Sequence, residues 1–141
     1  PSGIACHCGA FGCLETEVRR DRLLEVTGLL SESADDLALV LASSVDPRVR
    51  AEVTRQLDML IVALRNLVNL FNPKLIILGG FLAALQMADP ARLEDFGRNR
   101  PLTASFHCVE ILPSELAADL LMIGASELAF EGLLADPAGF C

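Results

Sequence analysis

The chain has 141 residues, of which 52% are hydrophobic and 21% charged, with a formal net charge of −8. This acidic balance argues against nucleic-acid binding by the chain itself, since phosphate contacts need clustered bases and the one dense basic group is Arg19, Arg20 and Arg22, which we assign to a solvated helix face. Apolar runs stay short of the roughly 20 residues of a membrane span, so the apolar excess predicts burial against another subunit or more of the polypeptide.

The first feature along the chain is the cysteine cluster in "CHCGAFGCLE", where Cys6, Cys8 and Cys13 form the pattern C-x-C-x4-C. Disulfide pairing explains it poorly, because three is odd and thiols this close in sequence close a strained ring. Thiolates on a tight loop suit zinc, and Gly9 and Gly12 allow the backbone to fold around an ion. We therefore favour metal binding, with three incidental thiols as the alternative.

The fourth ligand of such a site is the difficulty. His7 lies between two ligands on the same short loop, so its ring is expected to point away, and His107 falls in a predicted strand. Cys108 and Cys141 read as a buried apolar side chain and a free terminal thiol. A ligand before Pro1 would complete the site, so we expect the chain to be a fragment of a longer protein.

Three helices are predicted next. Residues 14–26 form an exposed helix that ends at Gly28, and a capping box at Ser33 and Asp36 opens a second helix. Asp46 and Pro47 begin the third and strongest helix, which runs to Phe71. Its apolar positions form one stripe, and from Met59 onward apolar residues fill the other faces, so we expect a central helix buried nearly all round. The stripe consists of Val53, Leu57, Leu60, Leu64, Leu67 and Phe71.

The remainder alternates strand and helix. The run "KLIILGG" at residues 74–80 reads as a strand buried on both faces, as in a parallel sheet, and Gly79 and Gly80 turn the chain into a helix at residues 81–88. A second strand is predicted at residues 105–112 and a last helix at residues 115–135, capped by Ser114. The fold class is therefore α/β, a single helix-rich domain with a small sheet.

Three segments together resemble one known family. These are "CHCGAFGCLE", "NPKLIILGG" and "IGASELAFEGLLADP", in that order along nearly the whole chain. They resemble the ROK family of bacterial sugar kinases and sugar-responsive repressors. The family motif C-x-C-G-x-x-G-C-x-E is matched at every fixed position, by Cys6, Cys8, Gly9, Gly12, Cys13 and Glu15.

This resemblance implies the C-terminal portion of a lobe of the actin-like ATPase (hexokinase) type. Residues 1–15 would be the zinc-binding loop, residues 16–71 a helical part and residues 72–141 the strand–helix part. In the family, three cysteines matching Cys6, Cys8 and Cys13 hold a structural zinc with an upstream histidine that this chain lacks, so zinc is expected to be weakened or lost. The glutamate matching Glu15 belongs to the sugar pocket, where it accepts hydrogen bonds from hydroxyls; a helix-start acid is the alternative reading.

Gly79 and Gly80 match the family's nucleotide-side loop, where backbone amides can approach a phosphate. The alternative is a tight strand-to-helix turn, which we favour because the bulk of Phe81 follows directly. Neither the D-x-G-x-T phosphate loop nor a general-base aspartate of the kinases is found in these 141 residues, so no catalytic residue is assigned.

On this basis the chain is predicted to be the sugar-sensing and oligomerisation portion of a ROK transcriptional repressor of the NagC/XylR type. The alternative is the C-terminal lobe of a glucokinase-like sugar kinase, which transfers phosphate from ATP to a hexose. The resemblance implies a homo-oligomer in the cytoplasm, a small sugar as ligand, and DNA binding only through a preceding domain.

Overall fold

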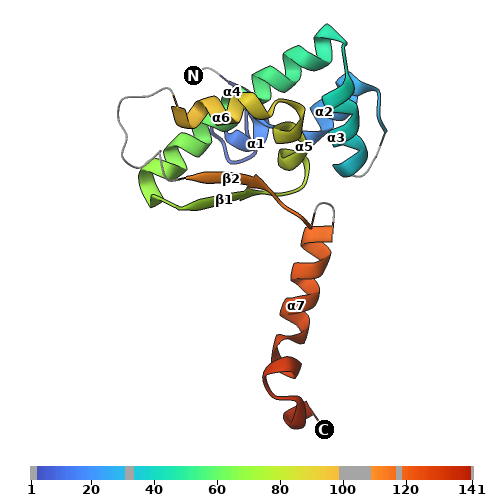
Figure 1. The fold of residues 1–141 in the computed structure, drawn as a ribbon, viewed down its shortest axis with the longest axis vertical. Coiled ribbons are helices and arrows are strands. Elements are labelled where there is room, and N and C mark those ends of the chain that lie inside the picture. The colour runs from blue at the N-terminus through green and yellow to red at the C-terminus, as the bar shows by residue number, and fades with distance from the viewer. Residues whose placement is uncertain (1–2, 31–33, 99–108, 117–118, 141) are drawn as a thin grey trace.

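The computed structural model describes residues 3–30, 34–98, 109–116 and 119–140 (Figure 1). A compact helical body carries a short sheet on one side, and the last helix stands away from it. In chain order the elements are α1 (Leu14–Glu17), α2 (Arg20–Thr27), α3 (Ala34–Ser43), α4 (Pro47–Phe71), β1 (Leu75–Leu78), α5 (Phe81–Ala88), α6 (Pro90–Arg98), β2 (Glu110–Pro113), α7 (Leu120–Ala135) and the 3-10 helix η3 (Pro137–Phe140).

Helix α4 is the centre of the body, as predicted. It begins with Asp46, whose carboxylate accepts the backbone N–H of Arg48 at 2.8 Å, and with Pro47 in the first turn. It ends at Asn72, which adopts a left-handed conformation directly before Pro73. Helices α1, α2, α3, α5 and α6 all contact it.

The buried face of α4 differs from the prediction in its second half. Leu57, Leu60 and Leu64 are buried, but the next buried side chain is Val68, while Leu67 and Phe71 are exposed. The predicted positions average about 3.6 residues per turn, as in a straight helix, so the stripe stays on one face, and Leu67 and Phe71 are exposed because no described residue covers that face at this end of the helix. The expectation of burial all round is also wrong, since Leu70 is 74% exposed.

The predicted helix over residues 14–26 is broken into α1 and α2. The break lies at Val18 and Arg19, because Gln56 of α4 bonds there to backbone groups that a continuous helix would use itself. The Gln56 side-chain oxygen accepts the N–H of Arg19 at 2.9 Å, and its NH₂ group donates to the Arg19 carbonyl at 3.0 Å. Gln56 is fully buried, and its amide group fixes the N-terminal segment to α4.

Most other predicted features of this segment are confirmed. Gly28 has φ 74° and closes α2 as a left-handed C-cap. Arg19 pairs with Asp21 and Arg22 with Glu25 at the surface. The predicted cap at Ser33 lies outside the described residues.

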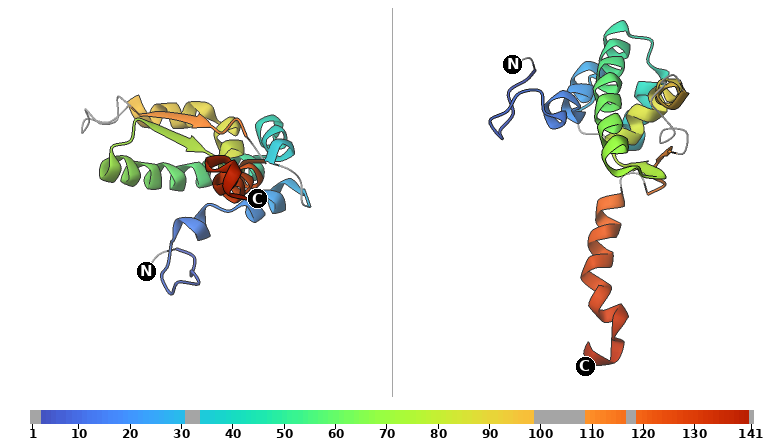
Figure 2. Two further views of the ribbon diagram at one scale, coloured as in Figure 1. Left: turned by 90° about the horizontal axis from the view of Figure 1, so that it is seen from below. Right: turned by 90° about the vertical axis from the view of Figure 1, so that its left-hand side faces the viewer.

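The sheet consists of two parallel strands, with Leu75 opposite Glu110 and Leu78 opposite Pro113. The parallel pairing was predicted, but burial on both faces was not correct. Leu78 is 4% exposed, whereas Ile77 on the other face is 61% exposed, because the body covers only one side (Figure 2). The predicted residues 105–108 of the second strand lie outside the described residues, as do His107 and Cys108.

Helix α6, between the strands, was not predicted from the sequence. It begins at Asp89 and Pro90, the same pair of residue types that opens α4, and the Asp89 carboxylate accepts the N–H of Arg92 at 3.3 Å. Arg92 also donates to Asp58 of α4 at 2.8 Å. Helices α5 and α6 therefore lie in the chain between the two parallel strands and pack against α4.

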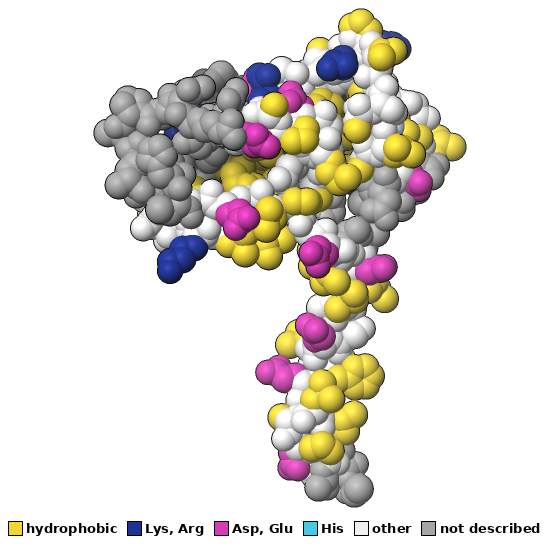
Figure 3. Space-filling model, in the orientation of Figure 1, with side chains coloured by type: hydrophobic (Ala, Val, Ile, Leu, Met, Phe, Trp, Pro, Cys, Tyr) yellow, Lys and Arg dark blue, Asp and Glu magenta, His cyan; other side chains and the backbone are white. Residues whose placement is uncertain are grey.

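Helix α7 begins five residues later than predicted, at Leu120 instead of residue 115. Ser114 does bond locally, since its hydroxyl accepts the N–H of Leu116 at 3.2 Å, but this closes a turn before the helix. The helix extends away from the body, and apolar side chains lie along the face of it that Figure 3 shows. Its exposed apolar residues include Leu121 and Leu128. No described helix combines the length and the apolar character that a membrane span requires.

We predict that Gln56→Ala lowers the free energy of unfolding by about 1–3 kcal/mol, because it leaves the N–H and carbonyl of Arg19 without their partner in the interior. Chemical denaturation measures this change. The control is Asn66→Ala, which removes an exposed amide from the same helix and should stay within about 0.5 kcal/mol of the unchanged protein. Equal effects of the two substitutions would contradict the role of Gln56.

Candidate metal centre

The cysteine loop, residues 4–13, is a small hairpin. The N–H of Gly12 donates to the Ile4 carbonyl at 2.9 Å, the N–H of Cys6 donates to Ala10 at 2.9 Å, and the N–H of Gly9 donates back to Cys6 at 3.0 Å. A bridge between Ala5 and Phe11 adds to this pairing. The hairpin therefore places its first strand, with Cys6, beside the end that leads to Cys13.

Two glycines make this hairpin possible, one by conformation and one by contact. Gly9 has φ 87°, in the left-handed region that favours glycine. A Cβ atom on Gly3 would lie 2.5 Å from the Cα of Gly12, so the two backbones touch where side chains cannot fit. The loop can thus close tightly before it joins α1.

The hairpin gathers the three predicted ligands. The sulfur atoms of Cys6, Cys8 and Cys13 all lie within 4.8 Å of one another, and those of Cys8 and Cys13 are 3.6 Å apart. Tetrahedral zinc with bonds of about 2.3 Å to sulfur requires neighbouring sulfurs to be about 3.8 Å apart. The cluster could therefore bind a metal ion with little movement of the loop.

Hydrogen bonds separate the acidities of these thiols. The backbone N–H of Ala10, followed by the side chains of Cys6 and Cys13, lowers the pKa of Cys8 below its usual value. The hydrogen bond to Cys8 is the main cause that raises the pKa of Cys13 to about 11. Cys8 is therefore the more acidic of these two thiols.

His7 turns toward Glu15, and together with Cys6 these two residues form a second group whose ligand atoms lie within 4.8 Å of one another and could hold a metal ion. Its Nδ1 atom lies 3.5 Å from a carboxylate oxygen of Glu15 and 3.7 Å from the sulfur of Cys6. Both His7 and Glu15 are exposed, with Glu15 on the first turn of α1. The structure thus places Glu15, the carboxylate predicted to contact sugar, directly beside the cysteine loop.

Sequence reasoning missed Glu17, which anchors the loop. One of its carboxylate oxygens accepts the N–H of Ile4 at 3.0 Å, and the other lies 3.2 Å from the guanidinium of Arg55. Both partners are far from Glu17 in the chain, and the sequence offers no local signal for either contact.

Gly79 and Gly80 lie apart from the loop in sequence, at the turn between β1 and α5. A Cβ atom on Gly79 would lie 2.6 Å from a side-chain carbon of Leu120, and Gly80 has φ 56°. Phe81 is half-buried and packs against the core. These contacts account for the two glycines as a tight strand-to-helix turn.

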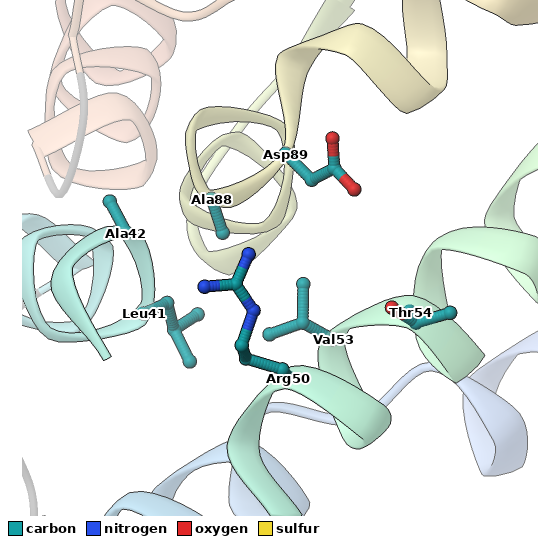
Figure 4. A pocket seen from close by; sticks show the side chains of 7 residues that line it. All are labelled: Leu41, Ala42, Arg50, Val53, Thr54, Ala88 and Asp89. Carbon is teal, nitrogen blue, oxygen red and sulfur yellow. The ribbon is translucent and has the colours of Figure 1, made fainter. Parts of the chain in front are cut away.

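A separate small hollow lies between α3, α4 and the end of α5 (Figure 4). The guanidinium of Arg50 extends into it between Leu41 and Val53 toward Ala88. None of the residues predicted to bind metal, sugar or nucleotide lines it. Its complete lining is Leu41, Ala42, Arg50, Val53, Thr54, Ala88 and Asp89.

Comparison with known proteins gives the family. The model of the ROK family matches residues 1–131. The chain belongs to the ROK family. A xylose repressor from Caldicellulosiruptor bescii is 24% identical over 147 aligned residues, which cover 94% of this chain and 37% of that protein.

A solved ROK structure confirms the fold class. It is a ROK family transcriptional regulator described as a homologue of the E. coli MLC protein, with a TM-score of 0.59 and 25% identity over 80% of this chain. The match covers 32% of that regulator. The chain thus has the helix-rich α/β architecture of part of an actin-like ATPase fold and spans about a third of the length of these relatives.

We predict different alkylation profiles for Cys8 and Cys13 in metal-free protein. Because the thiolate is the reactive form and the pKa of Cys8 is lowered, Cys8 should react with iodoacetamide at a lower pH than Cys13, whose reaction should rise only toward pH 11. Peptide mapping after short exposures to iodoacetamide measures this order. The exposures run from pH 6 to pH 11, a range of about five units around the usual thiol pKa. Equal profiles would contradict this difference in acidity.

Proposed function

We propose that this ROK chain is the sugar-sensing and oligomerisation portion of a transcriptional repressor. The supporting observation is that the matched relatives are a repressor and a transcriptional regulator, and that the chain aligns with them over most of its length. On this proposal the portion itself performs no chemistry, and DNA is bound by another part of the protein.

The cysteine cluster is the structural metal site of this proposal. Cys6, Cys8 and Cys13 would hold zinc through their thiolates, and family resemblance supplies a histidine as the fourth ligand. Bound zinc would crosslink the two ends of the hairpin. Because α1 begins immediately after Cys13, the crosslink would fix the position of Glu15 on the first helical turn.

Glu15 would bind the sugar through hydrogen bonds. Its carboxylate is exposed and can accept hydrogen bonds from two neighbouring hydroxyl groups. His7, 3.5 Å away, can orient this carboxylate and contribute a further polar contact. A nucleotide role for Gly79 and Gly80 stays a prediction, and the packing of Leu120 and Phe81 around them favours a purely structural turn.

In the complete gene product, we predict that Glu15→Ala weakens sugar binding about tenfold or more, because charge-assisted hydrogen bonds to hydroxyls are lost. Titration calorimetry with a panel of monosaccharides that includes D-xylose and D-glucose measures the change. Glu25→Ala, which removes an exposed carboxylate from α2, is the matched control and should bind as the unchanged protein does.

Two results would oppose this proposal. Equal sugar affinity of Glu15→Ala and Glu25→Ala would remove Glu15 from the sugar site. Formation of a sugar phosphate when ATP is added to the same samples would replace the repressor proposal with a ROK sugar kinase.

Helix α7 provides the oligomerisation surface of this proposal. We predict that the 141-residue chain elutes above its 15.1 kDa monomer mass in size-exclusion chromatography, because exposed apolar surface of this extent drives association. Joint Leu121→Glu and Leu128→Glu substitution should return it to a monomer, since these side chains are 82% and 73% exposed. Ser126→Glu adds a charge to the same helix without removing apolar area, and should leave the elution unchanged. A monomeric unchanged chain would contradict the prediction.

A further inference from the structure

The cysteine loop is joined to the body through a continuous chain of charged and amide groups. It begins at the backbone N–H of Ile4, which donates to the carboxylate of Glu17 at 3.0 Å. The same carboxylate lies 3.2 Å from Arg55, and a second nitrogen of Arg55 donates to the Glu17 carbonyl at 2.8 Å. Glu17 is thus bonded through both its side chain and its backbone.

A second carboxylate holds Arg55 in place. Glu52, one turn earlier in α4, accepts from Arg55 at 2.7 and 3.1 Å and from the side chain of Gln56 at 2.8 Å. These bonds raise the pKa of Arg55 and lower that of Glu52, so both stay charged. Gln56 is itself bonded to Arg19. Glu52, and with it the guanidinium of Arg55, is therefore held in the position from which Arg55 reaches Glu17.

The position of Ile4 connects these bonds to the three sulfur atoms. Its N–H is held by Glu17, while its carbonyl accepts from Gly12, next to Cys13. Cys6 and Cys8 follow Ile4 on the hairpin, whereas Cys13 is fixed by the start of α1. The bond from Ile4 to Glu17 therefore ties the strand that carries the first two sulfurs to the helix that follows the third.

We propose that Glu17 and Arg55 are positioning residues for the cysteine loop, which hold its three sulfurs close together before a metal binds. The metal-binding part of this inference rests on the proposed function, but the shape of the metal-free loop does not. Neither residue contacts a sulfur; Arg55 acts through Glu17, and Glu17 acts through Ile4.

The first test uses the 141-residue chain without metal. Amide hydrogen exchange of residues 4–13 reports the hydrogen bonds of Cys6, Gly9 and Gly12 directly. We expect exchange of these amides to be at least about tenfold faster in Glu17→Ala and in Arg55→Met than in the unchanged chain. Glu25→Ala and Arg50→Met, which remove an exposed carboxylate and an exposed guanidinium, are the matched controls and should not change it.

Comparing amide exchange in the loop with exchange in α4 distinguishes a positioning role from a contribution to overall stability. If Glu17 and Arg55 contributed only to overall stability, their substitution would make amide exchange faster in α4 as well as in the loop. The loss of stability measured by the denaturation midpoint would then explain both increases. We expect the loop to exchange faster while the centre of α4 remains protected. Glu17→Gln retains an acceptor for Ile4 but loses its charge, so its loop should exchange at an intermediate rate. An unchanged loop in both Glu17→Ala and Arg55→Met would overturn the proposal.

The second test adds zinc and measures its release to a chromophoric chelator. We expect release to be about tenfold faster from Glu17→Ala than from Glu25→Ala, which is the scale of effects that outer-shell groups have on bound metals. Release at the same rate from both would overturn the proposed link to metal binding. If the complete gene product binds no zinc, the proposed metal site fails, and the exchange experiment alone decides the role of Glu17 and Arg55.

Discussion

Two consecutive side chains of α4, Arg55 and Gln56, determine how the N-terminal segment lies on this protein. The buried amide of Gln56 satisfies both backbone groups of Arg19, and Arg55 bonds to the backbone and side chain of Glu17. A buried amide is stable only when its hydrogen-bond partners are present, so few other side chains could replace Gln56 in this contact. The break between α1 and α2, and through it the orientation of the cysteine loop, depends on this short stretch of α4.

This arrangement separates two properties of the candidate site. Local hairpin bonds among residues 4–13 bring the sulfurs together, and in our proposal Glu17 and Arg55 hold the loop in this shape. The direction in which Glu15 projects is set by α1, whose other end is fixed to α4 at Glu17. A ligand that contacts Glu15 is therefore connected mechanically to the central helix of the body.

Local chemistry was sufficient to predict several elements. Asp46 and Pro47 specify the start of α4, Gly28 specifies the end of α2, and the spacing of the cysteines specifies the ligand cluster. The same reasoning would have found α6 at Asp89 and Pro90, but a short apolar pattern there gave a weaker signal. The break at Arg19 could not be predicted, because the group that causes it is 37 residues away. The exposure of Ile77 and Leu70 also could not be predicted, because an apolar pattern states that a side chain prefers burial and does not state what covers it.

The sequence separations of these contacts have a consequence for the order of folding. Hairpin bonds of the cysteine loop join residues at most eight positions apart, whereas all of α5 and α6 lie in the chain between Leu75 and Glu110, which pair in the sheet. Short loops close much sooner than long ones. The thiols of Cys8 and Cys13 should therefore meet early during synthesis, before α4 is complete, when an oxidant could still join them into a crosslink that excludes any later ion.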